Sequence, residues 1–254
     1  MDKYGLIGYP LGHSFSRRFF TEKFTREGID ATYDNYEIPD ARMILDVVRD
    51  NPELRGLNCT IPHKQAILPL LDWFSTEARE IGAVNVIRIR RDMNARIRLE
   101  GFNTDVIGFA ESIKPLLSSE HRNALVLGTG GASRAVCYAL SRLGLRWTYV
   151  SRSRHEGMLT YDDLTPDTMQ TYQVVVNCSP AGMYPHVDEA PRLPYEAMGR
   201  HHLLYDLVYN PEETLFMKLG AQQGAVVKNG LEMLHLQALA SWEIWNGRSK
   251  DFTF

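Results

Sequence analysis

Three glycines near the middle of the chain form its most specific chemical pattern. Gly128, Gly130 and Gly131 stand in "VLGTGGASRA", between the apolar run 124–127 and a helical pattern that reaches Leu143. A continuous apolar run is typical of a strand covered on both faces. Glycines between a strand and a helix let the backbone approach a pyrophosphate, and the helix N-terminus offers free N–H donors. The pattern predicts nucleotide binding, with a purely structural turn as the alternative.

The end of the next predicted strand, 146–152, indicates which nucleotide is bound. Sites for NAD usually place an acidic residue there to hold the ribose 2′-hydroxyl. This chain instead has Ser151, Arg152, Ser153 and Arg154. A carboxylate would repel a 2′-phosphate, whereas an arginine attracts one and can stack on adenine. The segment favours NADP over NAD, although both arginines could also be solvated surface charges.

A lysine in the first part of the chain is a candidate for proton transfer. In "GLNCTIPHKQAIL", Pro62 is expected to end a strand and open a helix, which places Lys64 in the first helical turn. The helix dipole disfavours a cation there, so a functional reason for the lysine is a reasonable hypothesis. Hydride transfer between an alcohol and NADP requires a group that moves the hydroxyl proton. Asp105, at the end of "GFNTD", is the carboxylate expected to control Lys64, and an ordinary solvated ion pair is the alternative.

The first hundred residues alternate short apolar runs with helical patterns, which indicates a mixed sheet with helices. The segment around "RDMNA" alternates apolar and polar residues on both sides and is expected to be a hairpin. Its candidates for the buried side are Val86, Ile89, Ile97 and Leu99. The other expected strands are 4–10, 31–39 and 54–62, and the expected helices are 16–28, 41–51 and 64–74, the last interrupted at Pro69.

After Asp105 the order strand, glycine turn, helix, strand predicts a parallel nucleotide-binding unit. We therefore expect an α/β protein with an N-terminal mixed-sheet α/β substrate domain, a C-terminal Rossmann-type dinucleotide-binding domain, and a cleft between them. The expected domains are residues 1–104 and 105–237, with 238–254 returning to the first. Further expected elements are a helix at 106–117, strands at 172–180 and 201–209, and a helix at 230–247 with a stripe of Leu231, Leu234, Ala238 and Trp242.

Composition excludes several classes of protein. The 254 residues carry a net charge of −3, whereas nucleic-acid binding normally needs a basic patch or domain. No stretch approaches the roughly 20 apolar residues of a membrane span. The three cysteines form no CxxC pair, so neither a disulfide framework nor a metal site is expected. A reduced, cytoplasmic protein is the default expectation.

Eight segments, in order along nearly the whole chain, together resemble a known family. They are "GYPLGHSFS" (8–16), "NCTIPHK" (58–64), "GAVN" (82–85), "GFNTD" (101–105), "GTGGASRA" (128–135), "NCSPAGM" (177–183), "YDLVYNPEET" (205–214) and "NGLEMLHLQA" (229–238). The chain resembles the shikimate dehydrogenases. The resemblance implies reversible reduction of 3-dehydroshikimate to shikimate with NADP, in aromatic amino acid biosynthesis. It also implies a small-molecule substrate as the partner. From the composition we expect neither nucleic acid nor a membrane as a partner, and we expect a monomer or homodimer.

The same resemblance implies roles for individual residues. Lys64 and Asp105 match the catalytic pair, in which the lysine passes a proton at the substrate's 3-oxygen. Ser14 and Ser16 match the serines that hold the substrate carboxylate, although either could instead be a helix N-cap. The remaining matches are Thr60, Asn85, Gln237 and Tyr209 for the substrate, Gly128, Thr129, Gly130, Gly131 and Ala132 for the cofactor loop, Ser151 and Arg152 for the adenosine phosphate, and Leu207 and Gly230 near the nicotinamide.

Three positions depart from the family pattern. Arg17 replaces a frequent proline, Cys59 replaces the usual valine, and "SRSRHEG" is less regular than the family's Asn-Arg-Thr segment. Two rival functions stay open. One is a quinate or quinate/shikimate dehydrogenase that uses NAD. The other is a non-catalytic ligand-binding module, since a fold alone does not establish an activity.

Overall fold

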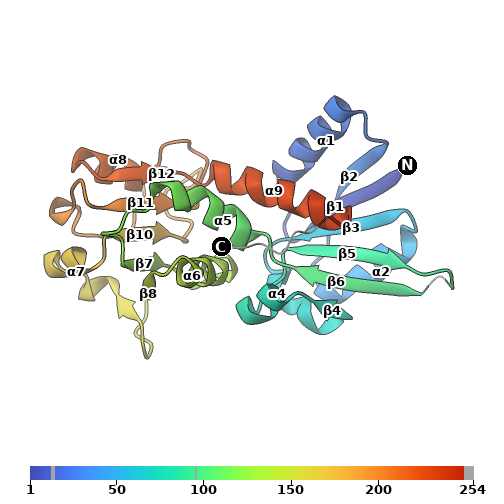
Figure 1. Cartoon of the computed structure of the whole chain (residues 1–254), viewed down its shortest axis with the longest axis horizontal. Helices are drawn as coiled ribbons and strands as arrows, with labels where there is room; N and C mark the ends of the chain where they lie inside the picture. The colour runs from blue at the N-terminus through green and yellow to red at the C-terminus, as the bar shows by residue number, and fades with distance from the viewer. Residues whose placement is uncertain (13–14, 95, 249–254) are drawn as a thin grey trace. The chain divides into compact units, whose positions relative to one another are not determined.

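The computed structural model describes residues 1–12, 15–94 and 96–248, which form two compact units (Figure 1). One unit holds residues 1–104 and 238–248, and the other holds residues 105–237. Within the described residues each unit is built on one six-stranded sheet. The expected α/β class is therefore confirmed.

The first unit has a mixed sheet in the order β2-β1-β3-β5-β6-β4. Strands β1, β2 and β3 are parallel, whereas β5 runs antiparallel to both β3 and β6. Its elements are β1 (Asp2–Gly8), α1 (Phe15–Glu27), β2 (Ala31–Glu37), η1 (Ala41–Met43), α2 (Ile44–Asp50), β3 (Leu54–Cys59), α3 (His63–Ala66), η2 (Leu68–Leu70), β4 (Trp73–Phe74), α4 (Thr76–Ile81), β5 (Val86–Arg91) and β6 (Ile97–Phe102).

Helices cover both faces of this first sheet. Successive residues of a strand point to opposite faces, so Leu6 and Ile7 of β1 belong to two different core clusters. On the face of Leu6, Phe20 of α1 packs with Trp245 of α9 (Leu231–Trp245), with ring centroids 5.2 Å apart. On the face of Ile7, the buried side chain of Ile44 contributes from α2. The sheet is therefore the middle layer of three.

The second unit has a parallel sheet in the order β12-β11-β10-β7-β8-β9. Its strand order reverses between β7 and β10, and such switch points are where parallel sheets bind ligands. Its elements are α5 (Asp105–Ile113), η3 (Lys114–Leu116), β7 (Asn123–Leu127), α6 (Gly131–Arg142), β8 (Arg146–Ser151), β9 (Leu159–Thr160), η4 (Tyr161–Asp163), α7 (Pro166–Thr171), β10 (Val174–Asn177), η5 (Tyr195–Ala197), β11 (Leu203–Asp206), α8 (Leu215–Gln222), β12 (Val226–Lys228) and the first part of α9.

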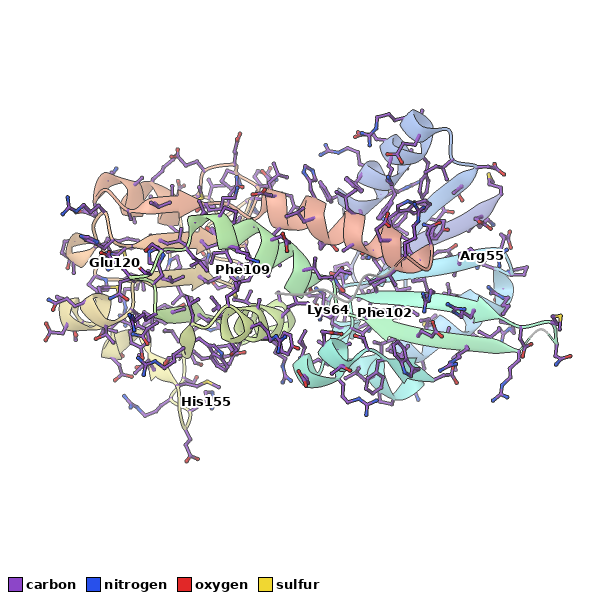
Figure 2. The ribbon with its side chains drawn as sticks, viewed as in Figure 1. Arg55, Lys64, Phe102, Phe109, Glu120 and His155 are labelled. Carbon is purple, nitrogen blue, oxygen red and sulfur yellow. The ribbon has the colours of Figure 1, made fainter. Side chains whose placement is uncertain are left out.

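Two contacts show how helices pack on this second sheet. Phe109 of α5, labelled in Figure 2, meets Tyr205 of β11 edge to face, with ring centroids 5.0 Å apart. Gly220 of α8 lies so close to Leu204 of β11 that a side chain at residue 220 would overlap it. Because Leu204 and Tyr205 are neighbours in one strand, α5 and α8 pack on opposite faces.

The expected helix over 64–74 is wrong. The chain forms the single turn of α3, then the 3-10 turn η2 and the short strand β4. Pro69 explains the break, because proline has no N–H and its ring clashes with the carbonyl four residues earlier. Lys64 therefore lies in one isolated turn, where the helix dipole that seemed to disfavour it is small.

The expected hairpin forms, but one of its four apolar candidates is not buried. Val86, Ile89 and Leu99 are at most 4% exposed, whereas Ile97 is 38% exposed. Ile97 pairs with Arg91 in the last pair before the turn. Val86 packs in a different core cluster from Ile89 and Leu99, so both faces of the hairpin carry buried residues, and the alternation of residue types does not show where its covered part ends.

Three helices that the apolar pattern did not indicate begin after a serine or threonine. The side chains of Ser75, Thr165 and Thr214 accept hydrogen bonds from backbone N–H groups in the first turns of α4, α7 and α8. Such N-caps stabilise short helices by satisfying otherwise unpaired donors. Short strand β12 was also not predicted.

Candidate active site

Two predicted substrate residues gather at one edge of the first sheet. Thr60 directly follows β3, and Asn85 directly precedes β5, which is antiparallel to β3. The backbone N–H of Cys59 donates to the carbonyl of Asn85 at 2.8 Å, and that of Thr60 donates to the carbonyl of Ile7 at 2.9 Å. These bonds fix both residues where β1 and β3 end.

The turn that carries Lys64 is held on two sides. The carbonyl of Lys64 accepts a hydrogen bond from the backbone N–H of Val84 at 2.8 Å. The neighbouring His63 is buried, and its Nε2 lies 2.7 Å from the carbonyl oxygen of Ile38. Lys64, labelled in Figure 2, is half-buried. The backbone of this lysine is therefore fixed, which a residue that transfers a proton requires.

A buried hydrogen-bond network fixes the residue before Asp105. The Asn85 amide accepts from the backbone N–H of Thr104 at 2.7 Å and donates to the Thr104 hydroxyl at 3.1 Å. That hydroxyl also lies 3.2 Å from Ser241 Oγ, and Asn58 donates to Ser241 at 3.1 Å. The segment leading into Asp105 is thus bound to the same edge that presents Thr60 and Lys64.

Tyr33 extends this network to Ser16. Its hydroxyl donates to Asn58 Oδ1 at 2.8 Å. Burial raises the pKa of Tyr33, and a hydrogen bond with Ser16 opposes that rise only in part, so the phenol stays protonated. Sequence reasoning singled out neither Tyr33 nor Ser241 as a site residue, because their partners lie 25 and 183 residues away. Asn58 belongs to the family segment "NCTIPHK", and this membership was the only local sign of a role in the site.

Ser16 is the second residue of α1 and therefore not its N-cap. Ser14 lies outside the described residues. Of the two nearby departures from the family pattern, Arg17 is exposed, and Cys59 is 2% exposed within the core, where a small apolar side chain fits.

Asp105 and Gln237 belong to the second unit. Asp105 is the first residue of α5 and is only 6% exposed; a helix N-terminus favours a carboxylate. Gln237 is 7% exposed and donates to the carbonyl of Leu234 at 2.8 Å. Gly108 lets α5 approach α9, because a side chain there would overlap the carbonyl of Met233. Since Lys64 belongs to the first unit, its pairing with Asp105 stays a prediction.

The predicted cofactor loop lies at the carboxyl edge of the second sheet. Leu127, Asn177 and Asp206 are register partners at the ends of β7, β10 and β11. Gly128 follows directly with φ of +97°, a conformation that favours glycine. Gly130 is the N-cap of α6. A side chain added at this position would meet open space, so the loop can receive a bulky group. Thr129 is exposed and Gly131 and Ala132 are half-buried.

Two residues predicted near the nicotinamide touch one another. A side chain at Gly230 would overlap the backbone carbonyl of Leu207, so only glycine fits there without a shift. The backbone N–H of Gly230 also donates to the carbonyl of Val208 at 3.2 Å. Tyr209, the predicted substrate residue two positions after Leu207, is 39% exposed.

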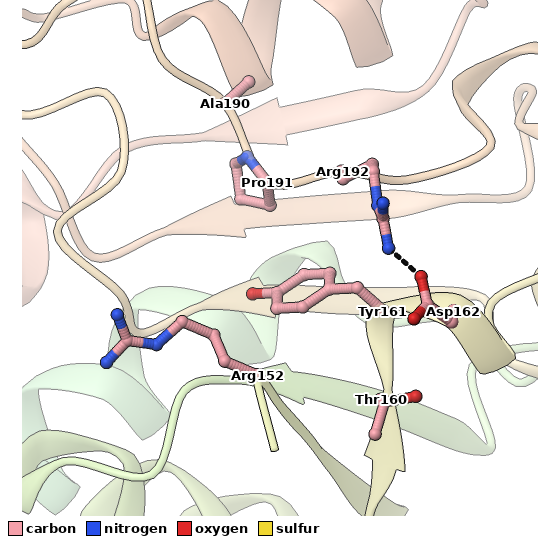
Figure 3. A pocket seen from close by; sticks show the side chains of 7 residues that line it. All are labelled: Arg152, Thr160, Tyr161, Asp162, Ala190, Pro191 and Arg192. Atoms are coloured by element: carbon pink, nitrogen blue, oxygen red, sulfur yellow. Dashed lines mark hydrogen bonds and ion pairs between the residues drawn. The ribbon is translucent and has the colours of Figure 1, made fainter. Parts of the chain in front are cut away.

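Arg152 lines a pocket of about 350 Å³ with six other residues (Figure 3). Tyr161 stands in this pocket beside Arg152. Burial raises the pKa of Tyr161, partly opposed by the Arg152 cation. Arg192, which lines the same pocket, forms an ion pair with Asp162, and Arg154 pairs with Asp163 at 2.9 Å. The role of Arg152 at the adenosine phosphate stays a prediction. Tyr161 and Arg192, which line the same pocket, were not predicted.

The residues at this edge fit a dinucleotide. The glycine loop has room for a phosphate before a twelve-residue helix. The lack of a side chain at Gly230 avoids an overlap with the backbone of Leu207. Among the residues that the structure describes, no three His, Cys, Asp or Glu side chains gather as a metal site. No helix in the described part of the chain is long and apolar enough to span a membrane.

Comparison with known proteins agrees with this arrangement. Residues 6–87 match the family described as the shikimate dehydrogenase substrate binding domain. The "Shikimate dehydrogenase (NADP(+))" of Caldanaerobacter subterraneus subsp. tengcongensis is 32% identical over 99% of this chain and 94% of its own length. The Thermus thermophilus shikimate 5-dehydrogenase, solved with NADP(H) and shikimate, is 30% identical with a TM-score of 0.83, covering 97% of this chain and 94% of its own.

The fold is shared with an enzyme of another name. The 5-ketofructose reductase of a Gluconobacter species is 28% identical with a TM-score of 0.82, and the match covers 98% of this chain and 94% of that one. Its likeness shows that this scaffold occurs with more than one named substrate. The relatives with 30% identity or more over nearly the whole chain decide the family, and the chain belongs to the shikimate dehydrogenases.

Proposed function

We propose that this chain catalyses the reversible, NADP-dependent reduction of 3-dehydroshikimate to shikimate in aromatic amino acid biosynthesis. Relatives that match this chain over 94% and 89% of their own length bear the name of this activity. The observation that carries the proposal is the hydrogen-bonded pair of Asn85 and Thr104. It holds the residue before Asp105 at the sheet edge that presents Lys64.

We assign the chemistry to Lys64 and Asp105. In the direction of reduction, Lys64 donates a proton to the oxygen at C3, and in the reverse direction it accepts that proton. Asp105 orients the lysine and binds a substrate hydroxyl. NADPH supplies the hydride when it is bound. Ser14 and Ser16 hold the substrate carboxylate, and Thr60, Asn85, Gln237 and Tyr209 bind the rest of the ring through groups that donate and accept hydrogen bonds.

We assign cofactor binding to the carboxyl edge of the second sheet. The glycine loop from Gly128 to Ala132 and the N-terminus of α6 hold the pyrophosphate. Ser151 and Arg152 hold the adenosine phosphate, and Leu207 and Gly230 border the nicotinamide. We further propose a cytoplasmic location, where the three free thiols would remain reduced.

The test is a matrix of two substrates and two cofactors. Purified protein is given shikimate or quinate with NADP or NAD, and the absorbance of the reduced nicotinamide is followed. We expect the fastest reduction with shikimate and NADP. Activity mainly with quinate or NAD would place the chain with the quinate/shikimate dehydrogenases. Inactivity with all four pairs would contradict the proposal and support a non-catalytic module. Size-exclusion chromatography of the same sample distinguishes a monomer from a homodimer, the two expected states.

A further inference from the structure

The buried carboxylate of Asp206 has no role in the mechanism above. It nevertheless accepts hydrogen bonds from several segments at the carboxyl edge of the second sheet, where the cofactor is proposed to bind. Asp206 is the last residue of β11 and is 0% exposed. Its Oδ1 accepts from Asn177 Nδ2 at 2.9 Å and from the backbone N–H of Val208 at 3.0 Å. Its Oδ2 accepts from Thr214 Oγ1 at 2.6 Å. Three donors from three positions in the chain therefore converge on one carboxylate.

The Asn177 side of this cluster extends to the glycine loop. Asn177 Oδ1 accepts from the backbone N–H of Ser179 at 3.0 Å and from its hydroxyl at 2.6 Å. Its Nδ2 also lies 3.4 Å from the carbonyl of Ala181. A side chain at Gly128 would lie 3.4 Å from the N–H nitrogen of Ser179, in ordinary contact. The segment after β10 is thus fixed beside the predicted pyrophosphate loop.

The Thr214 side fixes the segment 207–214, which carries Leu207 and Tyr209. Thr214 ends this segment as the N-cap of α8, while Val208 lies near its start, so Asp206 binds both ends. A side chain at Gly182 would lie 3.4 Å from Thr214 Cβ, so the segment after β10 packs against Thr214. The backbone N–H of Tyr184 donates to the carbonyl of Asn210 at 3.1 Å. The two segments therefore support each other.

We infer that Asp206 is a positioning residue, which holds the segments of Ser179 and Leu207 in the arrangement that binds the nicotinamide half of NADP. The inference depends on the proposed function for the identity of the cofactor. Asp206 acts through Asn177, Val208 and Thr214, and the ionised carboxylate suits this task because it can accept from all three donors at once.

The charge state of Asp206 changes within the range where the enzyme can be assayed. Burial raises the pKa of Asp206 from 3.8 to about 6, although the bonds from Thr214, Val208 and Asn177 lower it. Cys178 and Tyr195 interact with this carboxylate electrostatically; burial raises the pKa of both, so they are neutral near pH 6. A proton on Asp206 would occupy one of the acceptor positions. NADPH affinity should therefore fall as the pH drops through about 6.

The first test replaces Thr214. Thr214→Val removes the hydroxyl with little change in shape, and the Kd for NADPH is measured by cofactor fluorescence without substrate. We expect about tenfold weaker binding, with affinity restored in Thr214→Ser. Ser112→Ala is the matched control, because it removes another buried hydrogen bond of the same unit, from Ser112 Oγ to Tyr205 OH at 2.7 Å. The control should lower thermal stability and leave the Kd unchanged.

The second test isolates the charge. Asp206→Asn does not titrate and carries an N–H donor in place of one acceptor oxygen, so it stands in for the protonated carboxyl at every pH. We expect its Kd for NADPH to be up to about tenfold weaker than the wild-type value at about pH 8, and the two Kd values to converge at about pH 5, where the wild type is itself protonated. The 2′-phosphate of the cofactor titrates with both proteins, so it cancels in the ratio.

Two outcomes would overturn the inference. One is wild-type affinity for NADPH in folded Thr214→Val, and the other is a ratio of Kd values for wild type and Asp206→Asn that does not change with pH. Failure of the proposed function would look different. The chain would then bind NADPH with the expected dependence on Thr214 and Asp206 but would not oxidise shikimate.

Discussion

Asn58 Nδ2 donates a hydrogen bond to Ser241 Oγ at 3.1 Å, joining residues 183 positions apart in the sequence. Asn58 lies in β3, one residue before Cys59 and two before Thr60, and Ser241 lies in α9. Since Ser241 Oγ is also 3.2 Å from Thr104 Oγ1, one buried hydroxyl connects the strand that leads to Lys64 with the residue that precedes Asp105. The closing helix therefore supports both parts of the proposed catalytic pair.

Ser241→Ala should weaken this support. The change leaves Asn58 and Thr104 each without one buried partner, which costs about 1–3 kcal/mol in the free energy of unfolding. We expect kcat/KM for shikimate to fall, because Thr104 loses a constraint, while the Kd for NADPH stays the same. Denaturant unfolding and steady-state kinetics measure the two effects. Unchanged kinetics in a destabilised variant would show that Ser241 is important only for stability.

Gly230→Ala should disturb the nicotinamide end of the cofactor edge. The added methyl group would overlap the Leu207 carbonyl, which is backbone and cannot rotate away. Overpacking of this kind costs about 1–3 kcal/mol, and we expect weaker NADPH binding as the Leu207 segment shifts. Gly199→Ala is the matched control, because its methyl group would lie 3.8 Å from the nearest atom of Gln223. Equal affinity in the two variants would contradict the role of Gly230.

Arg152→Ala should reduce the preference for NADP. The variant removes the cation expected at the 2′-phosphate, which NAD lacks, so KM for NADP should rise roughly tenfold to hundredfold while KM for NAD changes little. Arg154→Ala serves as the control, since Arg154 is already paired with Asp163. Equal increases in KM for both cofactors would mean that Arg152 binds the adenine alone.

Asp206→Asn should also change how stability depends on pH. The folded-state pKa of Asp206, about 6, lies above the ordinary 3.8, so its contribution to stability is present below about pH 4 and is lost as the pH rises through 6. The shift corresponds to about 3 kcal/mol. The variant should therefore gain on the wild type by up to about this amount between pH 4 and pH 7, measured by denaturant unfolding at each pH. A constant difference would show that burial does not disfavour the charge. A carboxylate that costs stability is consistent with a residue kept for function.

Much of the second unit could be predicted from local sequence. The apolar run before Gly128, the glycines and the following helix are all encoded within about twenty residues, and β7 and α6 form there. The helices α4, α7 and α8 were missed because they are short and their signal is a single cap residue. The helix expected over 64–74 failed for the opposite reason, because Pro69 outweighed an apolar pattern.

The site could be predicted only in part. The family segments indicate Thr60, Lys64 and Asn85, and the structure places all three at one edge of the first sheet. The network behind them uses Tyr33 and Ser241, whose partners are distant in sequence, so no local pattern reveals them. Asp206 belongs to a family segment, but the three donors that converge on it become visible only when the strands are in register.

The most direct test of the account is the turnover of Lys64→Ala, with the Kd for NADPH measured on the same sample. Lys3→Ala is the control, because it removes another half-buried lysine of the same unit, one that pairs with Glu53 at 2.8 Å. The account predicts a kcat for shikimate oxidation lower by about 10²–10⁴, the usual contribution of a general acid or base, with the Kd for NADPH unchanged. Wild-type turnover in Lys64→Ala would contradict the assignment of proton transfer to this lysine.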